Sequence, residues 1–144
     1  MVLVSSDPRG EGALISEIAM LDERPGFMVL RGHKMLANSR WQGGGYELLY
    51  QTPEEQMRFL EAVPVDTLVM DMSSRGAPAH QKILEETVKR YPDRWRLAGL
   101  YPKNAGGENS EREIRVYRLA GFEPKPLSRI RSEIGPGILQ TIGR

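Results

Sequence analysis

Two pairs of adjacent serines stand where an apolar run ends and a helical pattern begins. One pair follows the short apolar run of residues 2–4, and the other follows the longer run of residues 65–72. In an open α/β sheet, ligands usually bind outside the carboxyl ends of the strands, and helix amino ends attract anions. The two turns therefore predict a site for a phosphate or a carboxylate. Its members are the four serines and the arginine that follows each pair: Ser5, Ser6, Arg9, Ser73, Ser74 and Arg75.

The same residues also fit ordinary turn chemistry. Neither segment matches the glycine-rich phosphate loops G-x-x-x-x-G-K-[ST] or G-x-G-x-x-G, and no lysine stands where the first of these needs one. Serine, aspartate, proline and glycine are common wherever a strand turns into a helix. Turn chemistry is therefore the favoured interpretation, and the anion site is the alternative to it.

Catalytic and metal-binding sets are incomplete in this chain. The absence of cysteine excludes disulfides, thiolate catalysis and cysteine-based zinc sites. His80 follows Ser73 and Ser74 closely enough to act as their base, with Asp71 to orient it, but the G-x-S-x-G motif is missing. A histidine at a helix start is more often solvated, and the other histidine, His33, lies too far along the chain for a ligand motif. We predict no catalytic residue, no metal site and no cofactor.

Composition and charge are ordinary for one globular domain. The chain has 144 residues and a net charge of +1, which does not favour nucleic acid as a partner. No apolar run approaches the roughly 20 residues of a membrane-spanning helix, so the chain as given is expected to be soluble. Trp41, Tyr46 and Tyr50 flank a triple glycine and could stack on a sugar or a base, but aromatics that close over the core are the favoured interpretation. The oligomeric state is left open.

The order of apolar patterns predicts a single three-layer α/β domain over residues 1–144. Its mixed, Rossmann-like sheet is expected to have parallel central strands and antiparallel edge strands. The tail, residues 119–144, is rich in proline and glycine and is compatible with one more edge strand at "SRIRSEI". Strands are expected at 2–4, 27–31, 65–72, "WRLAGLY" and "REIRVYRL", with "KMLANSRW" as a further strand or an irregular edge, and helices at 11–21, 52–63 and 80–91.

The segments "SSDPRGEGALISEIA", "FMVLRGHKMLANSRWQGGGYELLYQTPEEQ", "VDTLVMDMS" and "IRVYRL" together resemble a known kind of domain. It is the carboxyl-terminal soluble domain of bacterial multi-spanning glycosyltransferases, which are similar to the dolichyl-phosphate-mannose–protein mannosyltransferases and the aminoarabinose transferases. The resemblance covers roughly Val2 to Leu119 and rests on layout, without an invariant motif.

The resemblance implies a non-catalytic accessory domain on the extracytoplasmic (periplasmic) side of a membrane enzyme that uses a polyprenyl-phosphate sugar donor. Its partners would be the membrane-embedded part of the same protein and a lipid phosphate or a glycan acceptor. No catalytic residue is carried over, because the family's catalytic carboxylates lie in loops next to the membrane helices. The alternative is a free-standing cytoplasmic α/β protein, either a small-ligand or anion binder or a small hydrolase.

Overall fold

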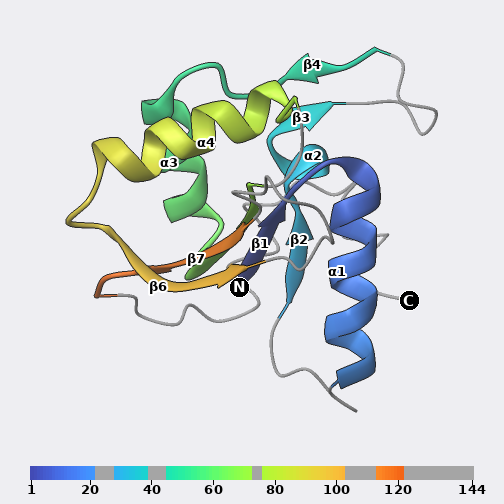
Figure 1. The fold of residues 1–144 in the computed structure, drawn as a ribbon. Helices are drawn as coiled ribbons and strands as arrows, with labels where there is room; N and C mark the ends of the chain where they lie inside the picture. The colour runs from blue at the N-terminus through green and yellow to red at the C-terminus, as the bar shows by residue number, and fades with distance from the viewer. Residues whose placement is uncertain (22–27, 39–44, 73–75, 103–112, 122–144) are drawn as a thin grey trace.

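The protein is a five-stranded mixed sheet with helices on both faces. The computed structural model describes residues 1–21, 28–38, 45–72, 76–102 and 113–121 (Figure 1). In chain order the elements are β1 (Val2–Ser5), α1 (Pro8–Leu21), β2 (Val29–Arg31), α2 (Gly32–Met35), β3 (Ala37–Asn38), β4 (Glu47–Leu48), α3 (Pro53–Ala62), β5 (Thr67–Asp71), α4 (Ala79–Arg90), β6 (Trp95–Pro102) and β7 (Glu113–Leu119).

The sheet has the strand order β2-β1-β5-β7-β6. β1 pairs in parallel with both β2 and β5, whereas β7 is antiparallel to β5 and to β6. The expected parallel centre and antiparallel edge are thus confirmed. β1, the first strand of this sheet along the chain, lies between the second and third strands, β2 and β5. Doubly wound folds of the strand order 2-1-3-4-5 begin in this way, whereas the Rossmann order begins 3-2-1. The Rossmann-like part of the expectation stays a prediction.

The crossover from β1 to β2 and the crossover from β2 to β5 run in opposite directions along the sheet. The chain passes from β1 through α1 to β2, and then back through α3 to β5 on the other side of β1. Right-handed crossovers place such helices on opposite faces of the sheet, and Figure 1 shows α1 on one side of β1 and β2, with α3 and α4 on the other. This reversal makes the boundary between β1 and β5 the switch point of the topology, where ligands of open α/β sheets bind.

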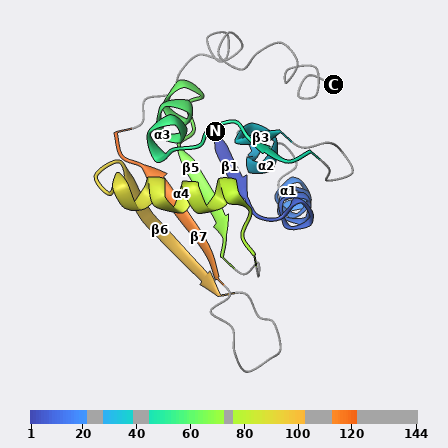
Figure 2. The ribbon, with the colours of Figure 1, turned by 90° about the horizontal axis from the view of Figure 1, so that it is seen from above.

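The apolar core lies between the sheet and the α3–α4 pair. Leu68 and Met70 of β5 are buried there with Leu60 of α3 and Leu84 of α4, and α4 crosses over the strands in Figure 2. Trp95 closes one end, where its indole N–H lies 3.3 Å from the Met57 sulfur. β5 is therefore the buried interior strand that its apolar sequence predicts.

Local signals account for the elements that hold this core. The Thr52 hydroxyl accepts a hydrogen bond from the Glu55 amide (3.2 Å), and the Glu55 carboxylate accepts one from the Thr52 amide (3.2 Å), which forms a capping box at the start of α3. Both predicted helices at 52–63 and 80–91 are confirmed as α3 and α4, and the predicted antiparallel edge pair is confirmed as β6 and β7.

One expected element is different. Residues 34–41 were expected to be a strand or an irregular edge, but Lys34 and Met35 belong to the short helix α2. Of the described residues in this segment, 34–38, only Ala37 and Asn38 are extended, and they pair with β4 in a separate two-stranded sheet. The predicted extra edge strand in the tail falls on residues 122–144, outside the described residues.

Candidate functional site

Three parallel strands end side by side at one edge of the sheet. β1 ends at Ser5, β2 at Arg31 and β5 at Asp71, and α1 and α2 begin directly after the first two. A hydrogen bond spans the switch point, because the Ser6 hydroxyl donates to Asp71 Oδ2 at 3.1 Å and both residues are buried. The ends of β1 and β5 are thus joined by side chains at the place where this topology favours a ligand.

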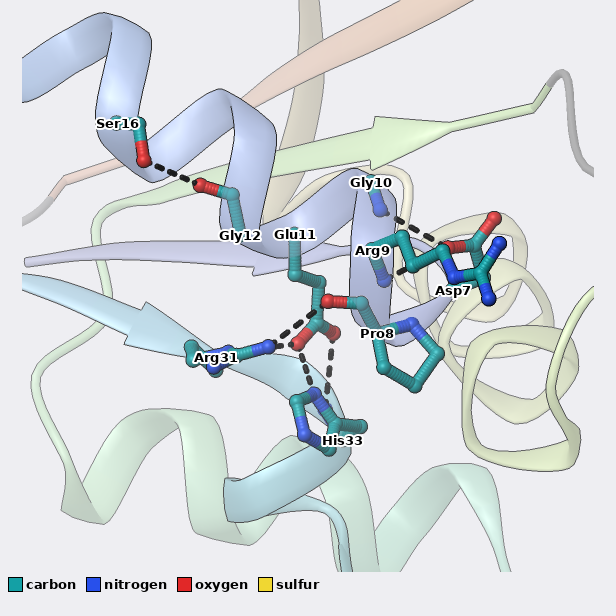
Figure 3. A network of polar contacts seen from close by, with 9 residues as sticks. All are labelled: Asp7, Pro8, Arg9, Gly10, Glu11, Gly12, Ser16, Arg31 and His33. Carbon is teal, nitrogen blue, oxygen red and sulfur yellow. Dashed lines mark hydrogen bonds and ion pairs between the residues drawn. The ribbon is translucent and has the colours of Figure 1, made fainter. Parts of the chain in front are cut away.

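Glu11 and His33 form a buried pair beside this edge. Glu11 lies in the first turns of α1 and is fully buried; its Oε1 accepts a hydrogen bond from the His33 backbone N–H (3.0 Å), and its Oε2 contacts His33 Nδ1 (Figure 3). Arg31 Nε is 3.4 Å from the same carboxylate. Burial raises the pKa of Glu11, and the contacts with His33 and the charge of Arg31 oppose that shift. The carboxylate therefore contacts both the backbone and the ring of His33.

The amino end of α1 already holds a carboxylate. Asp7 Oδ1 accepts hydrogen bonds from the backbone N–H groups of Arg9 (2.8 Å) and Gly10 (2.9 Å), as Figure 3 shows. Arg31 Nη2 also donates to the Pro8 carbonyl at 2.9 Å. An external anion at this helix start would therefore compete with the side chain of Asp7 for the same donors.

His80 lies in the first turn of α4 and is held by a residue from a distant segment. The Tyr46 hydroxyl accepts a hydrogen bond from the His80 backbone N–H (3.0 Å) and lies 2.9 Å from His80 Nδ1. We assign the phenolic proton to the bond with Nδ1, which places the imidazole proton on Nε2. Burial, with a smaller effect of His33, lowers the pKa of His80 to about 4, so the ring is neutral at pH 7.

Four buried polar side-chain atoms, one on β1, one on α3 and two at the start of α4, have no hydrogen-bond partner among the described residues. Two of them are the side-chain amide oxygens of Gln56 and Gln81. The amide nitrogens of the same side chains are paired: Gln56 Nε2 donates to the His80 carbonyl (3.2 Å), and Gln81 Nε2 donates to the Asp71 carbonyl (2.8 Å). Buried polar groups are normally paired, and each exception calls for an explanation such as a water or a ligand. The four atoms are Ser5 Oγ, Gln56 Oε1, His80 Nε2 and Gln81 Oε1.

Comparison with protein-family models, with curated proteins and with solved structures gave no match.

The predicted anion site is only partly within the described residues. Ser5 is fully buried at the end of β1, Ser6 is bonded to Asp71, and Arg9 is exposed on α1. Ser73, Ser74 and Arg75, the other half of the predicted set, fall outside the described residues. Because β1 and β5 are parallel neighbours, the carboxyl ends of these two strands lie at the same edge of the sheet. Anion binding by this set stays a prediction.

The expectation of a solvated His80 is wrong, because His80 is fully buried. Sequence reasoning also missed Glu11 and His33 as a pair. It favoured Tyr46 as an aromatic that closes over an edge of the core; Tyr46 is 42% exposed and is bonded to His80. One signal was available: His33 and His80, the two histidines of the chain, each follow closely on the carboxyl end of a predicted strand. Within the described part, no three histidine, aspartate or glutamate side chains are arranged to hold a metal.

Across the described residues, no helix combines the length and the apolar character needed to cross a bilayer.

Proposed function

We propose that this chain is a small-ligand-binding α/β domain whose ligand lies at the carboxyl ends of β1 and β5. One observation carries the proposal: buried polar side chains converge at this edge, and four of their atoms have no partner among the described residues. Burying an unpaired polar group costs about 1–3 kcal/mol. A ligand that pairs with these atoms would offset that cost, and the switch point of an α/β sheet is where such ligands bind.

The ligand-binding role is proposed to be non-catalytic. A serine nucleophile needs a base within hydrogen-bond reach. The Ser6 hydroxyl donates to Asp71, and Ser5 Oγ makes no hydrogen bond to any described residue, a histidine included. The small-hydrolase alternative therefore gains no support from these two serines.

The sequence resemblance adds a proposed cellular context and a partner for this domain. In that setting the chain is an extracytoplasmic accessory domain of a membrane glycosyltransferase that uses a polyprenyl-phosphate sugar donor, and its partner is the membrane-embedded part of the same protein. The reading frame upstream of Met1 tests this setting. Several apolar segments of about 20 residues each would support it, and a native start at Met1 would leave a free-standing ligand binder.

Ligand binding is tested by recording amide NMR spectra of the chain during titrations with inorganic phosphate, sugar phosphates and free sugars. At least one probe should shift signals of Ser6, Gly10, His33 and His80, while Arg96 on the far edge strand β6 stays unchanged. His80→Gln should weaken that response, and Arg96→Gln is the matched control on an exposed residue. Spectra that no probe changes at millimolar concentration would contradict the proposal.

A further inference from the structure

The amino end of α4 is capped by a side chain from a distant segment. Its N-cap residue is Pro78, which provides no side-chain hydrogen bond. The first-turn N–H of His80 is bonded to the hydroxyl of Tyr46, 34 residues earlier in the chain. Tyr46 is 42% exposed whereas His80 is fully buried, so of these two bonded residues only Tyr46 is open to solvent. A compound arriving from solvent can contact Tyr46 directly, but not His80.

The contacts of the Tyr46 hydroxyl indicate what kind of group this place accepts. The same oxygen accepts the backbone N–H of His80 and, with the phenolic proton assigned to the bond with Nδ1, donates to that ring nitrogen. A hydroxyl can do both, whereas an ionised phosphate oxygen or a carboxylate only accepts. The atoms without a partner among the described residues are mixed in the same way. With the tautomer assigned above, His80 Nε2–H is a donor, and the amide oxygens of Gln56 and Gln81 are acceptors.

The charges at this edge also favour a neutral ligand. Glu11 and Asp71 are buried carboxylates, and Asp7 already caps α1. Arg31 is engaged by Glu11 and by the Pro8 carbonyl. A phosphate placed among these groups would meet like charge with little water to screen it.

We infer that the ligand is a neutral, hydroxyl-bearing compound of the sugar type, and that one of its hydroxyls takes the place of the Tyr46 hydroxyl on His80. The inference rests on the proposed function, because it names the ligand class of the same site. Tyr46 then acts as an internal competitor that closes the site when no ligand is present.

The test compares the chain with its Tyr46→Phe variant, using a set of methyl hexopyranosides and inorganic phosphate at equal ionic strength as probes. The variant keeps the ring and loses the hydroxyl, so the ligand no longer has to displace two hydrogen bonds. The glycoside dissociation constant should fall roughly tenfold. Tyr50→Phe is the matched control, because the Tyr50 ring packs on Phe59 and its hydroxyl makes no hydrogen bond to a described residue. It should leave the constant unchanged.

A second measurement does not depend on the variant. In the unchanged chain, glycosides should shift the ring signals of His80 and Tyr46 together. Shifts from phosphate without shifts from glycosides would overturn the ligand class and leave the proposed function standing. Weaker glycoside binding by Tyr46→Phe would overturn the replacement of Tyr46, since it would make the hydroxyl a ligand contact. No response to any probe would overturn the proposed function and the inference together.

Discussion

Replacing Gly10 by alanine is expected to destabilise the protein, although alanine is normally the better helix residue. Gly10 and Gly12 both lie in α1. A methyl group at Gly10 would stand 2.2 Å from Ser6 Oγ and 3.1 Å from Ser6 Cβ, whereas one at Gly12 would have no atom within 4 Å. The Ser6 hydroxyl must therefore move in the Gly10→Ala variant, and its hydrogen bond to Asp71 is lost.

The magnitude follows from two opposing terms. Gly→Ala inside a helix stabilises by about 1 kcal/mol. Loss of a buried hydrogen bond to a charged group costs about 1.5–3 kcal/mol, so Gly10→Ala should lower the free energy of unfolding by roughly 0.5–2 kcal/mol. Gly12→Ala carries the favourable term alone. The helix-propensity term cancels between the two variants, and their difference reports the loss of the Ser6–Asp71 bond.

Urea denaturation followed by the fluorescence of buried Trp95 measures both variants. A Gly10→Ala variant as stable as Gly12→Ala would refute the reasoning. A double-mutant cycle with Ser6→Ala locates the cause, because most of the difference should disappear once the hydroxyl is absent. A difference that persists in that background would assign the cost to some other contact of the new methyl group.

Two further predictions concern a helix cap and the response to pH. Thr52→Ala should lower the free energy of unfolding by about 1 kcal/mol, because it removes the acceptor of the Glu55 amide; urea denaturation with Thr52→Ser as control checks it. The folded pKa of His80 is about 4, below its ordinary 6.5, so the unfolded chain binds more protons between those values and stability should fall by up to about 3 kcal/mol as pH drops through that window. The raised pKa of Glu11 has the opposite effect on stability above its ordinary 4.5, because the folded chain then binds more protons than the unfolded chain. The His80→Gln variant isolates the contribution of the histidine. An equally steep loss of stability with falling pH in that variant would contradict the assignment to His80.

The elements of the fold were predictable because their signals are local. The capping box Thr52-Pro53-Glu55 marks the start of α3 within four residues of sequence. The apolar run of residues 65–72 is typical of a strand covered on both faces, and β5 is such a strand. The alternation of strands and helices then restricts the topology, since right-handed crossovers leave few arrangements.

The candidate site was less predictable because its contacts join distant segments. α2 includes two of the residues that were expected to form a strand or an irregular edge. Gly32 at the start of α2 lies so close to β1 that an added Cβ would be 3.0 Å from the Val4 carbonyl oxygen. Buried His80 is bonded to Tyr46, which is 34 residues away. Periodicity and capping rules describe neighbours along the chain, so they could not reveal either contact.

The composition of this edge is itself an argument for a ligand. A turn from a strand into a helix requires turn residues. It does not require buried histidine, glutamate and glutamine side chains on the helices packed around that turn. Burying a polar pair such as Glu11 and His33 carries a desolvation cost that the contact between the two side chains has to offset, and unpaired buried polar atoms reduce stability. Sequences tend to depart from the rules of packing where function demands it. Polar groups at the switch point of the sheet, several of them without a partner among the described residues, are therefore better explained by binding than by folding.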